Sequence, residues 1–330
     1  MAGSLFLPPR FLNGSHRQTV LGAIPGSSKP CAGTRIEAID LGGGDQTTLH
    51  VHEPEAVLPK TPTVLLLHGL EGDANRHYMI RTANKFANQG FRTARMNMRC
   101  CGDAEEVSTQ FYNGAKSEDV RSAAKWARNN HPESPVVLVG FSLGANLMLK
   151  AAAEAEMNQD YAAVVAVSPP IDLHRCATSL LERSNRFYHK RFVHSLVDRA
   201  NRFRRRHGIV EDYGLSKDMT VVEFDSRFTV PMGGFRDVDD YYTTGSTKPK
   251  LEAIKCPWLI ITARDDTICP FGMYADAKFN GHGKLISPET GGHLGFVGRR
   301  RVGDPDRRWA ENRAVDFVME VLGMGGTSVF

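Results

Sequence analysis

The sequence predicts an α/β fold built on a mostly parallel β-sheet with helices on its faces. Short runs of β-branched and aliphatic residues alternate with helix-forming segments over most of the chain, a pattern that favours parallel strands joined by helices. One strand–helix junction carries the turn Gly140-Phe141-Ser142-Leu143-Gly144. A strand, a Gly-x-Ser-x-Gly turn and a helix in succession are typical of a nucleophile elbow, in which a sharp turn exposes a serine.

The elements are expected in a regular order. An alternating run over 35–41, a glycine-rich turn and a second run over 47–52 predict a leading hairpin. Apolar runs predict buried strands at 63–67, 91–96, 135–139, 162–167, 257–262 and 284–287. Helices are expected at 76–88, from Ser117 as an N-cap, at 145–155 and near 306–322. Between about 171 and 247 the alternation stops, and the sequence there is helical with irregular stretches and rich in Arg, Tyr and Phe.

The elbow makes Ser142 the candidate nucleophile. Gly140 and Gly144 lack the Cβ atoms that would clash in such a turn. The helix that follows presents free backbone N–H groups, which are useful where an oxyanion forms. A serine alone is a poor nucleophile, so this interpretation requires a base and an acid, which in this arrangement follow in the order Ser, Asp or Glu, His.

Both partners are expected downstream, at the ends of the last two strands. His293 lies among three glycines in Gly291-Gly292-His293-Leu294-Gly295, which indicates a loop rather than a helix face. Asp265 and Asp266 follow the strand at 257–262, at the sheet edge where open α/β folds place their chemistry. Adjacent residues point in different directions, so only one of the two aspartates can reach His293.

An oxyanion hole is expected beside Ser142. The strand at 63–67 runs into His68-Gly69-Leu70-Glu71-Gly72, the kind of loop that supplies one oxyanion N–H, and the residue after the nucleophile supplies the other. We therefore assign the two donors to the amides of Leu70 and Leu143. We expect His68 to be a buried residue that hydrogen-bonds the loop rather than a catalytic group.

Several motifs together resemble the α/β-hydrolases, and within them the YheT-like branch that includes the eukaryotic abhydrolase-domain members 1 to 3. These motifs are the segments 14–19 (Gly-Ser-His-Arg-Gln-Thr), 68–72, 97–102, the elbow, 224–231, 234–235 and 241–242. The resemblance covers nearly the whole chain and implies an α/β-hydrolase fold with serine hydrolase chemistry on carboxylic esters. The family's triad maps onto Ser142, the Asp265-Asp266 pair and His293. The family pattern Asp-x-x-x-Pro fits Asp266 and Pro270, and so favours Asp266 as the acid.

The resemblance also gives the segment without strand–helix alternation a role. α/β-hydrolases commonly insert a cap over the site at this place, so we assign 1–170 and 248–330 to the core and 171–247 to a cap or lid. We expect aromatic and apolar residues of this segment to roof a substrate pocket, namely Phe228, Met232, Phe235, Tyr241 and Tyr242.

Composition narrows the remaining possibilities. No run approaches the roughly 20 apolar residues of a membrane helix, no signal-peptide core is evident, and the anchor of the eukaryotic members is not expected here. Six scattered cysteines without metal spacing indicate free thiols and a cytoplasmic protein. A net charge of +4 is too weak to indicate nucleic-acid binding. We expect the basic runs at 202–207 and 299–301 either to be solvated at the surface or to contact an anionic membrane surface weakly. His50, His52 and Glu53 lack a convincing further ligand, so no metal site is expected.

The sequence therefore predicts a serine esterase for short, medium or lipid-like acyl groups that needs neither metal nor cofactor. An acyltransferase or thioesterase using the same three residues is the alternative, because only the acceptor or leaving group differs. A non-catalytic protein on this fold would be favoured if Ser142, Asp266 or His293 were missing, and all three are present. A peptidase is less favoured. The physiological substrate and the oligomeric state stay open.

Overall fold

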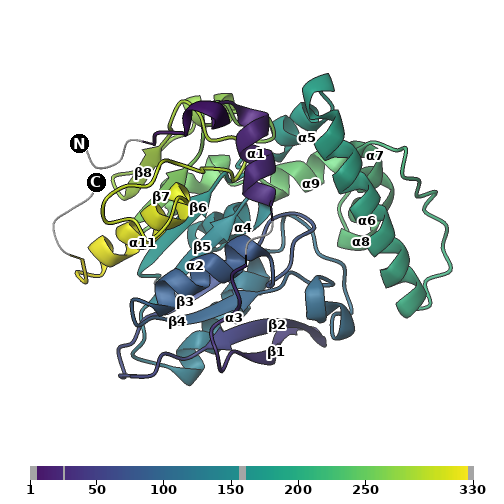
Figure 1. Ribbon diagram of the computed structural model, residues 1–330. Coiled ribbons are helices and arrows are strands. Elements are labelled where there is room, and N and C mark those ends of the chain that lie inside the picture. Colours follow the sequence, from purple (N-terminus) through teal and green to yellow (C-terminus); the bar gives the residue numbers. More distant parts are fainter. Residues whose placement is uncertain (1–5, 25–26, 156–160, 326–330) are drawn as a thin grey trace.

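The computed structural model describes residues 6–24, 27–155 and 161–325 of the 330-residue chain. Its centre is an eight-stranded sheet with the order β1-β2-β4-β3-β5-β6-β7-β8 (Figure 1). The pairs β1–β2 and β2–β4 are antiparallel, and all further pairs are parallel. The strands are β1 (Arg35–Gly42), β2 (Asp45–His52), β3 (Thr63–Leu67), β4 (Arg92–Met96), β5 (Val136–Phe141), β6 (Ala163–Val167), β7 (Trp258–Ile261) and β8 (Gly283–Ile286).

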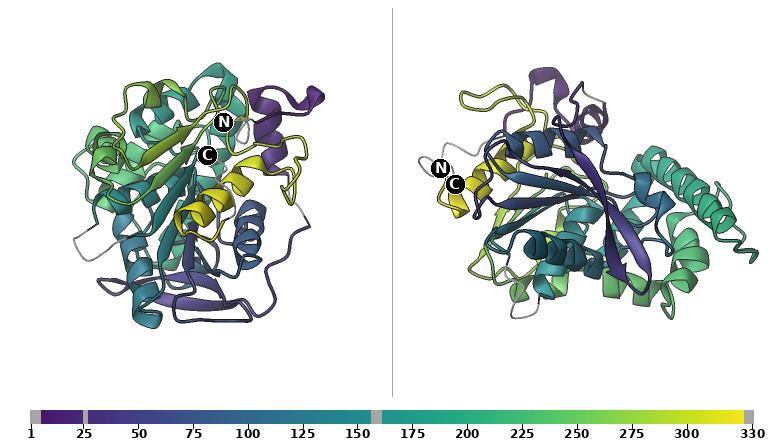
Figure 2. Two further views of the ribbon diagram at one scale, coloured as in Figure 1. Left: turned by 90° about the vertical axis from the view of Figure 1, so that its left-hand side faces the viewer. Right: turned by 90° about the horizontal axis from the view of Figure 1, so that it is seen from below.

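The central strands are continuous apolar runs because both faces of the sheet are covered. Alternate residues of β3, for example Val64 and Leu66, pack into one apolar cluster, while Leu65 and Leu67 pack into another. Helices α2 and α11 lie on the first face, and α3 and α4 on the second. Their bounds are α2 (His77–Ala87), α3 (Ser117–Asn130), α4 (Leu143–Ala153) and α11 (Trp309–Val321). The layered arrangement is visible from two further directions in Figure 2.

Strand register brings the candidate site residues to one edge of the sheet. Leu67 of β3 pairs with Gly140 of β5, and Phe141 pairs with Val167 of β6. Val167 in turn pairs with Ile261 of β7, and Ile261 with Ile286 of β8. The loops after these strands therefore begin side by side, which is where doubly wound sheets hold their ligands.

The segment 171–247, which we call the insertion, contains helices but no strand among its residues. It leaves the core after β6, returns before β7 and forms the layer around α5 to α9 in Figure 1. Its elements are α5 (Leu173–Leu180), η3 (Arg183–Asn185), α6 (Arg186–Arg206), α7 (Val221–Phe224), the π-helical turn η4 (Asp225–Thr229), α8 (Val230–Gly233) and α9 (Val238–Gly245). The expected loss of strand–helix alternation over this range is confirmed.

The remaining elements are short, apart from α1 near the start of the described chain. They are η1 (Arg10–Leu12), α1 (Ser15–Ala23), η2 (Gly102–Glu106), η5 (Lys248–Ala253) and α10 (Gly272–Ala275). The four expected helices each start one to three residues from the expected position. Ser117 is the first residue of α3 rather than its cap, and its hydroxyl donates to Glu154 at 2.6 Å. The last helix begins at Trp309, because the Asp306 carboxylate accepts the Arg308 amide in a turn before it.

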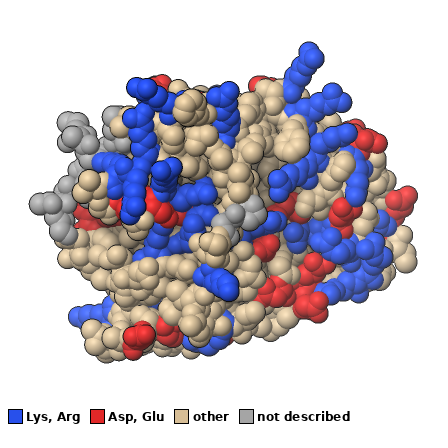
Figure 3. All heavy atoms as spheres, in the orientation of Figure 1, with Lys and Arg blue, Asp and Glu red and all other residues tan. Residues whose placement is uncertain are grey.

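On the face shown in Figure 3, Lys and Arg gather on the side of α6 and also on the opposite side, with acidic side chains between and around them. Arg202 pairs with Glu105 at 2.8 Å and Arg206 with Glu106 at 2.9 Å. These exposed pairs neutralise part of the basic run at the end of α6. Within the described ranges, no helix combines the length and the apolar character needed to cross a membrane.

Candidate active site

Ser142 occupies a strained turn between β5 and α4. Its backbone has φ 51° and ψ −123°, a region that residues other than glycine rarely adopt. The turn is held by the hydrogen bond from the Ser142 amide to the Val167 carbonyl at 2.9 Å. It also requires glycine on both sides, since a Cβ at Gly140 would lie 2.4 Å from the Ala145 Cα and one at Gly144 would lie 2.3 Å from the His68 carbonyl oxygen.

Three expected side chains form a continuous hydrogen-bond chain. The Ser142 Oγ lies 2.9 Å from the His293 Nε2, and the His293 Nδ1 lies 2.9 Å from the Asp266 Oδ2. The second carboxylate oxygen of Asp266 accepts the amides of Ile268 and Cys269, both at 2.9 Å. His293 and Asp266 are buried and Ser142 is partly exposed, so the chain runs from the interior toward an accessible hydroxyl.

Asp265, the competing aspartate, turns away from the imidazole. Its Oδ1 accepts the Gly292 amide at 2.9 Å. Burial raises the pKa of the Asp265 carboxyl above its ordinary value. The geometry therefore brings Asp266 to the ring of His293 and Asp265 to the backbone of the same loop.

The loop that carries His293 rests on α1, a contact that the sequence did not predict. The Thr19 hydroxyl accepts the His293 amide at 2.9 Å and donates to the Ser15 carbonyl at 2.9 Å. The Gln18 side chain is fully buried, donates to the Leu12 and Val297 carbonyls and accepts the Val297 amide at 2.8 Å. The Gly-Ser-His-Arg-Gln-Thr segment at 14–19 stood out in the sequence as a motif. Its contact with His293 could not be predicted, because the two lie more than 270 residues apart in the chain.

The loop after β3 lies directly against Ser142. A Cβ on Gly69 would approach the Ser142 Cβ to 2.9 Å, and Leu70 and Leu143 both line the pocket described below. Leu143 is the first residue of α4, where a backbone N–H has no acceptor within the helix. The assignment of the oxyanion hole to the Leu70 and Leu143 amides stays a prediction.

His68 is the buried loop residue that the sequence predicts. It accepts the Met98 amide at Nε2 (3.0 Å), and its Nδ1 lies 2.8 Å from the Gly69 carbonyl oxygen. Burial lowers the pKa of His68 to about 4. The neutral ring thus joins the loop after β3 to the loop after β4.

A buried polar network joins the same loop to the insertion. Glu71, next to Leu70, accepts the Tyr112 hydroxyl at 2.7 Å and the Arg199 Nε at 2.9 Å, and it also bonds the Ser195 hydroxyl. Ser195 and Arg199 belong to α6. Their spacing of four residues places both on one helix face, but no sequence signal identified their partner.

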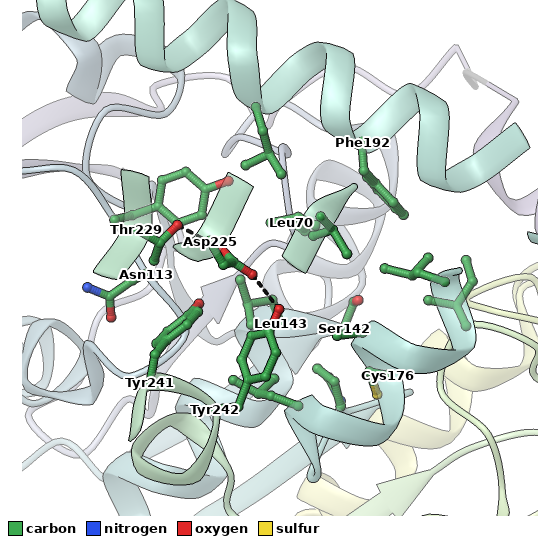
Figure 4. A pocket seen from close by; sticks show the side chains of 18 of the residues that line it. Leu70, Asn113, Ser142, Leu143, Cys176, Phe192, Asp225, Thr229, Tyr241 and Tyr242 are labelled. Carbon is green, nitrogen blue, oxygen red and sulfur yellow. Dashed lines mark hydrogen bonds between the residues drawn. The ribbon is translucent and has the colours of Figure 1, made fainter. Parts of the chain in front are cut away.

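An apolar pocket of about 770 Å³, counted with its part open to solvent, lies between the core and the insertion (Figure 4). Ser142 is in its wall. Aliphatic and aromatic residues of α5 and α6 form much of the lining, including Leu173, Ala177, Leu180, Phe192 and Leu196. Asp225 and Thr229 of η4 and two tyrosines of α9 add polar atoms to the wall.

Two of the five residues expected to roof this pocket, Tyr241 and Tyr242, lie in its wall. The other three do not, and that expectation is wrong for Phe228, Met232 and Phe235. Phe228 is fully buried and packs against Phe111 and Phe224. Met232 contacts the Tyr213 hydroxyl, and the ring of Phe235 lies 5.0 Å from that of Tyr241.

One group of three described residues has the donor types of a metal site: Asp266, Cys269 and His293, whose potential ligand atoms lie within 4.8 Å of one another. Their hydrogen bonds are better explained without a metal. Both oxygens of Asp266 are already used by His293 and two amides. Burial raises the pKa of the Cys269 thiol well above its ordinary value, which disfavours the thiolate that a metal needs. His50, which forms a candidate metal-ligand pattern with His52 and Glu53 in the sequence, instead places its Nε2 2.9 Å from the Asp103 Oδ2.

The fold and this site agree with the comparisons to known proteins. Residues 62–299 match the model of the alpha/beta hydrolase fold family. Because this match covers most of the chain, the protein belongs to that family. The elbow between β5 and α4 is the feature expected of this family.

Relatives extend the similarity beyond the matched range. An abhydrolase domain-containing protein of Dictyostelium discoideum is 26% identical over 97% of this chain and 82% of its own length. The Escherichia coli protein YheT is 26% identical over 96% of this chain and 94% of its own. A monoacylglycerol lipase of Saccharomyces cerevisiae is 28% identical over 75% of this chain and 57% of its own. The expected similarity to the YheT-like branch is thereby confirmed.

A solved structure gives the same architecture. The Pyrococcus furiosus esterase Pf2001 matches with a TM-score of 0.58 at 17% identity, over 96% of this chain and 98% of its own. At this identity the match supports the fold alone.

Proposed function

We propose that this protein is a serine hydrolase of carboxylic esters. The observation that carries the proposal is the hydrogen-bond chain Ser142–His293–Asp266, which ends at a partly exposed hydroxyl in the wall of an apolar pocket. Ser142 attacks the ester carbonyl while His293 takes its proton at Nε2. His293 then protonates the leaving alkoxide, and water hydrolyses the acyl-enzyme by the reverse transfers.

Asp266 orients the imidazole in this reaction. Its carboxylate fixes the proton of His293 on Nδ1, which leaves Nε2 free to accept from Ser142, and it stabilises the imidazolium that forms. The two amides on its other oxygen hold the carboxylate in place. The Leu143 and Leu70 amides hold the tetrahedral oxyanion, a contribution worth roughly 3–4 kcal/mol per donor in serine proteases.

The insertion acts as the cap that selects the substrate. The lining from α5 and α6 is aliphatic and aromatic, which favours uncharged, lipid-like acyl groups over peptides. A relative named as a monoacylglycerol lipase agrees with this class of substrate.

The protein is further proposed to work in the reducing cytoplasm. All six cysteines lie among the described residues and none forms a disulfide; the Cys176 and Cys269 sulfurs contact each other at 3.9 Å as thiols, as expected in a compartment that keeps thiols reduced. Alkylation of freshly lysed cells without reductant should modify the protein at six positions once it is denatured. Pairs of cysteines that resist alkylation because they form disulfides would contradict this localisation.

The catalytic proposal is tested at the nucleophile. A fluorophosphonate probe should label the wild-type protein, and Ser142→Ala should abolish both labelling and the hydrolysis of p-nitrophenyl esters. Ser226→Ala, a change at an exposed serine of the insertion, is the matched control and should keep both. Equal labelling of the Ser142→Ala variant would show that the nucleophile lies elsewhere.

A further inference from the structure

The apolar pocket contains a buried carboxylate that the proposed chemistry does not use. Asp225 lies in the pocket wall and is 9% exposed. Its Oδ1 accepts the Thr229 hydroxyl at 2.7 Å, and its Oδ2 accepts the Tyr242 hydroxyl at 2.8 Å. A carboxylate has about four acceptor positions, so these two bonds leave capacity for another donor.

A negative charge is costly at this buried place. Burial raises the pKa of Asp225 to about 6. An asparagine could satisfy the same two hydroxyls without a buried charge, since a hydroxyl both donates and accepts. Of the described residues that line the pocket, Asp225 is the single carboxylate, and none is Lys, Arg or His. A carboxylate facing a cavity without a cation favours a ligand that brings a hydrogen-bond donor.

The pocket also has two chemically different ends. In Figure 4, Asn113, Asp225, Thr229 and Tyr241 lie together on one side of Ser142, while Phe192 and Cys176 lie away from them. An acyl chain suits the apolar end, which leaves the polar end for the alcohol part of an ester. A neutral hydroxyl suits that end better than an ammonium group, because a neutral group loses less hydration on entering an apolar cavity.

We propose that Asp225 is the centre of an alcohol subsite, where its carboxylate accepts a hydrogen bond from a hydroxyl on the alcohol part of the substrate and disfavours anionic alcohols such as phosphate esters. This inference rests on the proposed ester hydrolysis and names the substrate class: neutral esters of polyols. Asp225 is thus a specificity residue of the pocket. Thr229 and Tyr242 position its two oxygens.

The test compares matched ligands that differ only in hydroxyl groups. Values of kcat/KM are measured for 1-monodecanoylglycerol and propyl decanoate with the wild-type protein, Asp225→Asn and Asp239→Asn. Asp239 is an exposed residue of α9, with 82% of its side-chain surface accessible, and its variant is the control. The preference for the glycerol ester should fall about 10-fold or more in Asp225→Asn, as expected for a lost hydrogen bond to a charged group, and stay unchanged in Asp239→Asn. An unchanged preference in Asp225→Asn overturns the proposal.

A binding measurement separates this proposal from the catalytic one. The ethers 1-O-decylglycerol and decyl propyl ether cannot be hydrolysed, so their dissociation constants report on the pocket even if Ser142 is not a nucleophile. The ratio of the two constants should fall by the same factor in Asp225→Asn. Failure of the proposed function would instead appear as absent probe labelling and absent ester turnover in the wild-type protein.

If Asp225→Asn does not fold, the subsite is tested by ligand binding to the wild-type protein alone. Decyloxyacetate carries an anion where 1-O-decylglycerol carries hydroxyls, so it should bind about 10-fold more weakly or worse. Equal or tighter binding of the anion would overturn the subsite.

Discussion

At the scale of single residues, the site depends on a serine held in a conformation that it would not adopt freely. A non-glycine residue with the φ of Ser142 costs about 1–3 kcal/mol. The turn persists because the chain on both sides is fixed by β5, by α4 and by contact with the His68 carbonyl. The strain places the hydroxyl 2.9 Å from the His293 Nε2, so it contributes directly to the proposed mechanism.

The two adjacent aspartates, Asp265 and Asp266, should contribute unequally to catalysis. Asp266→Asn should lower kcat by about 10²–10⁴-fold, because an amide stabilises the wrong tautomer of His293. Asp265→Asn should cost much less, since Asp265 contacts the Gly292 amide and not the ring. Steady-state kinetics on a p-nitrophenyl ester measures both. A larger loss in Asp265→Asn would transfer the orienting role to that residue.

The buried carboxylate of Asp225 predicts a pH dependence of stability. Its folded-state pKa of about 6 lies above the ordinary value of 3.8, so the folded protein holds this proton more tightly. The resulting stabilisation is fully present below about pH 4 and is lost as the pH rises through about 6. Tyr241 and Tyr242, the titratable neighbours, stay neutral because burial raises the pKa of each.

Between pH 4 and pH 7 the free energy of unfolding of the wild-type protein should fall by about 2–3 kcal/mol relative to that of Asp225→Asn, whose side chain does not titrate. Urea titrations of both proteins at each pH measure this difference. A difference that stays constant over this range would show that the carboxyl is not perturbed.

At the scale of elements, α1 supports the catalytic loop although it lies at the opposite end of the sequence. Thr19 accepts the His293 amide, and Gly22 lies so close to the loop that a Cβ there would meet the Leu294 carbonyl oxygen at 2.7 Å and the Gly295 Cα at 2.8 Å. Both near atoms belong to the backbone, so the helix or the loop would have to shift.

Gly22→Ala should therefore lower kcat by about 10–100-fold, because small displacements of a catalytic group are costly. The helix itself should not suffer, since alanine is the better helix former by about 1 kcal/mol. Kinetics together with thermal unfolding separates the two effects. Gly281→Ala, where a Cβ would have open space, is the control, and equal activities of the two variants would contradict a supporting role of α1.

The elements that the sequence predicted and those that it missed differ in the range of their interactions. The sequence predicted the central strands β3, β5 and β6, because strands buried on both faces are continuous apolar runs. It predicted the elbow because such a sharp turn requires glycine. The role of Thr19 could not be predicted, because it depends on one hydroxyl meeting a backbone amide far along the chain. Phe228 was placed in the pocket because it is aromatic, but it packs under the wall against Phe111.

At the scale of the whole molecule, the pocket exists because the insertion lies on the core. Neither part encloses it alone, since Ser142 and Leu143 come from the core and Phe192 and Leu196 from α6. The buried pair of Glu71 and Arg199, 2.9 Å apart, fixes α6 beside the oxyanion loop. Breaking such a pair by removing one partner typically costs about 3–5 kcal/mol, so the position of the insertion and that of Leu70 are linked.

This arrangement predicts that α6 sets the preferred length of the acyl chain. Phe192 lines the apolar end of the pocket, whereas Phe187 of the same helix is 68% exposed. Phe192→Ala removes a ring from the pocket wall and makes room there, so kcat/KM for esters of longer acyl chains should rise. Each methylene that fits an apolar pocket is worth about 1–3 kcal/mol in discrimination. We expect kcat/KM for chains beyond the wild-type optimum to rise about 10-fold relative to the optimum.

A series of p-nitrophenyl esters from acetate to palmitate measures this profile for the wild-type protein, Phe192→Ala and Phe187→Ala. The exposed control should keep the wild-type optimum, and all three proteins should react with the fluorophosphonate probe, because the substitution leaves Ser142 and its partners untouched. A shifted optimum in Phe192→Ala alone would assign chain-length selection to the face of α6 that meets the core. An unchanged profile would mean that the acyl chain leaves Ser142 by another route, and the pocket would then bind only the alcohol.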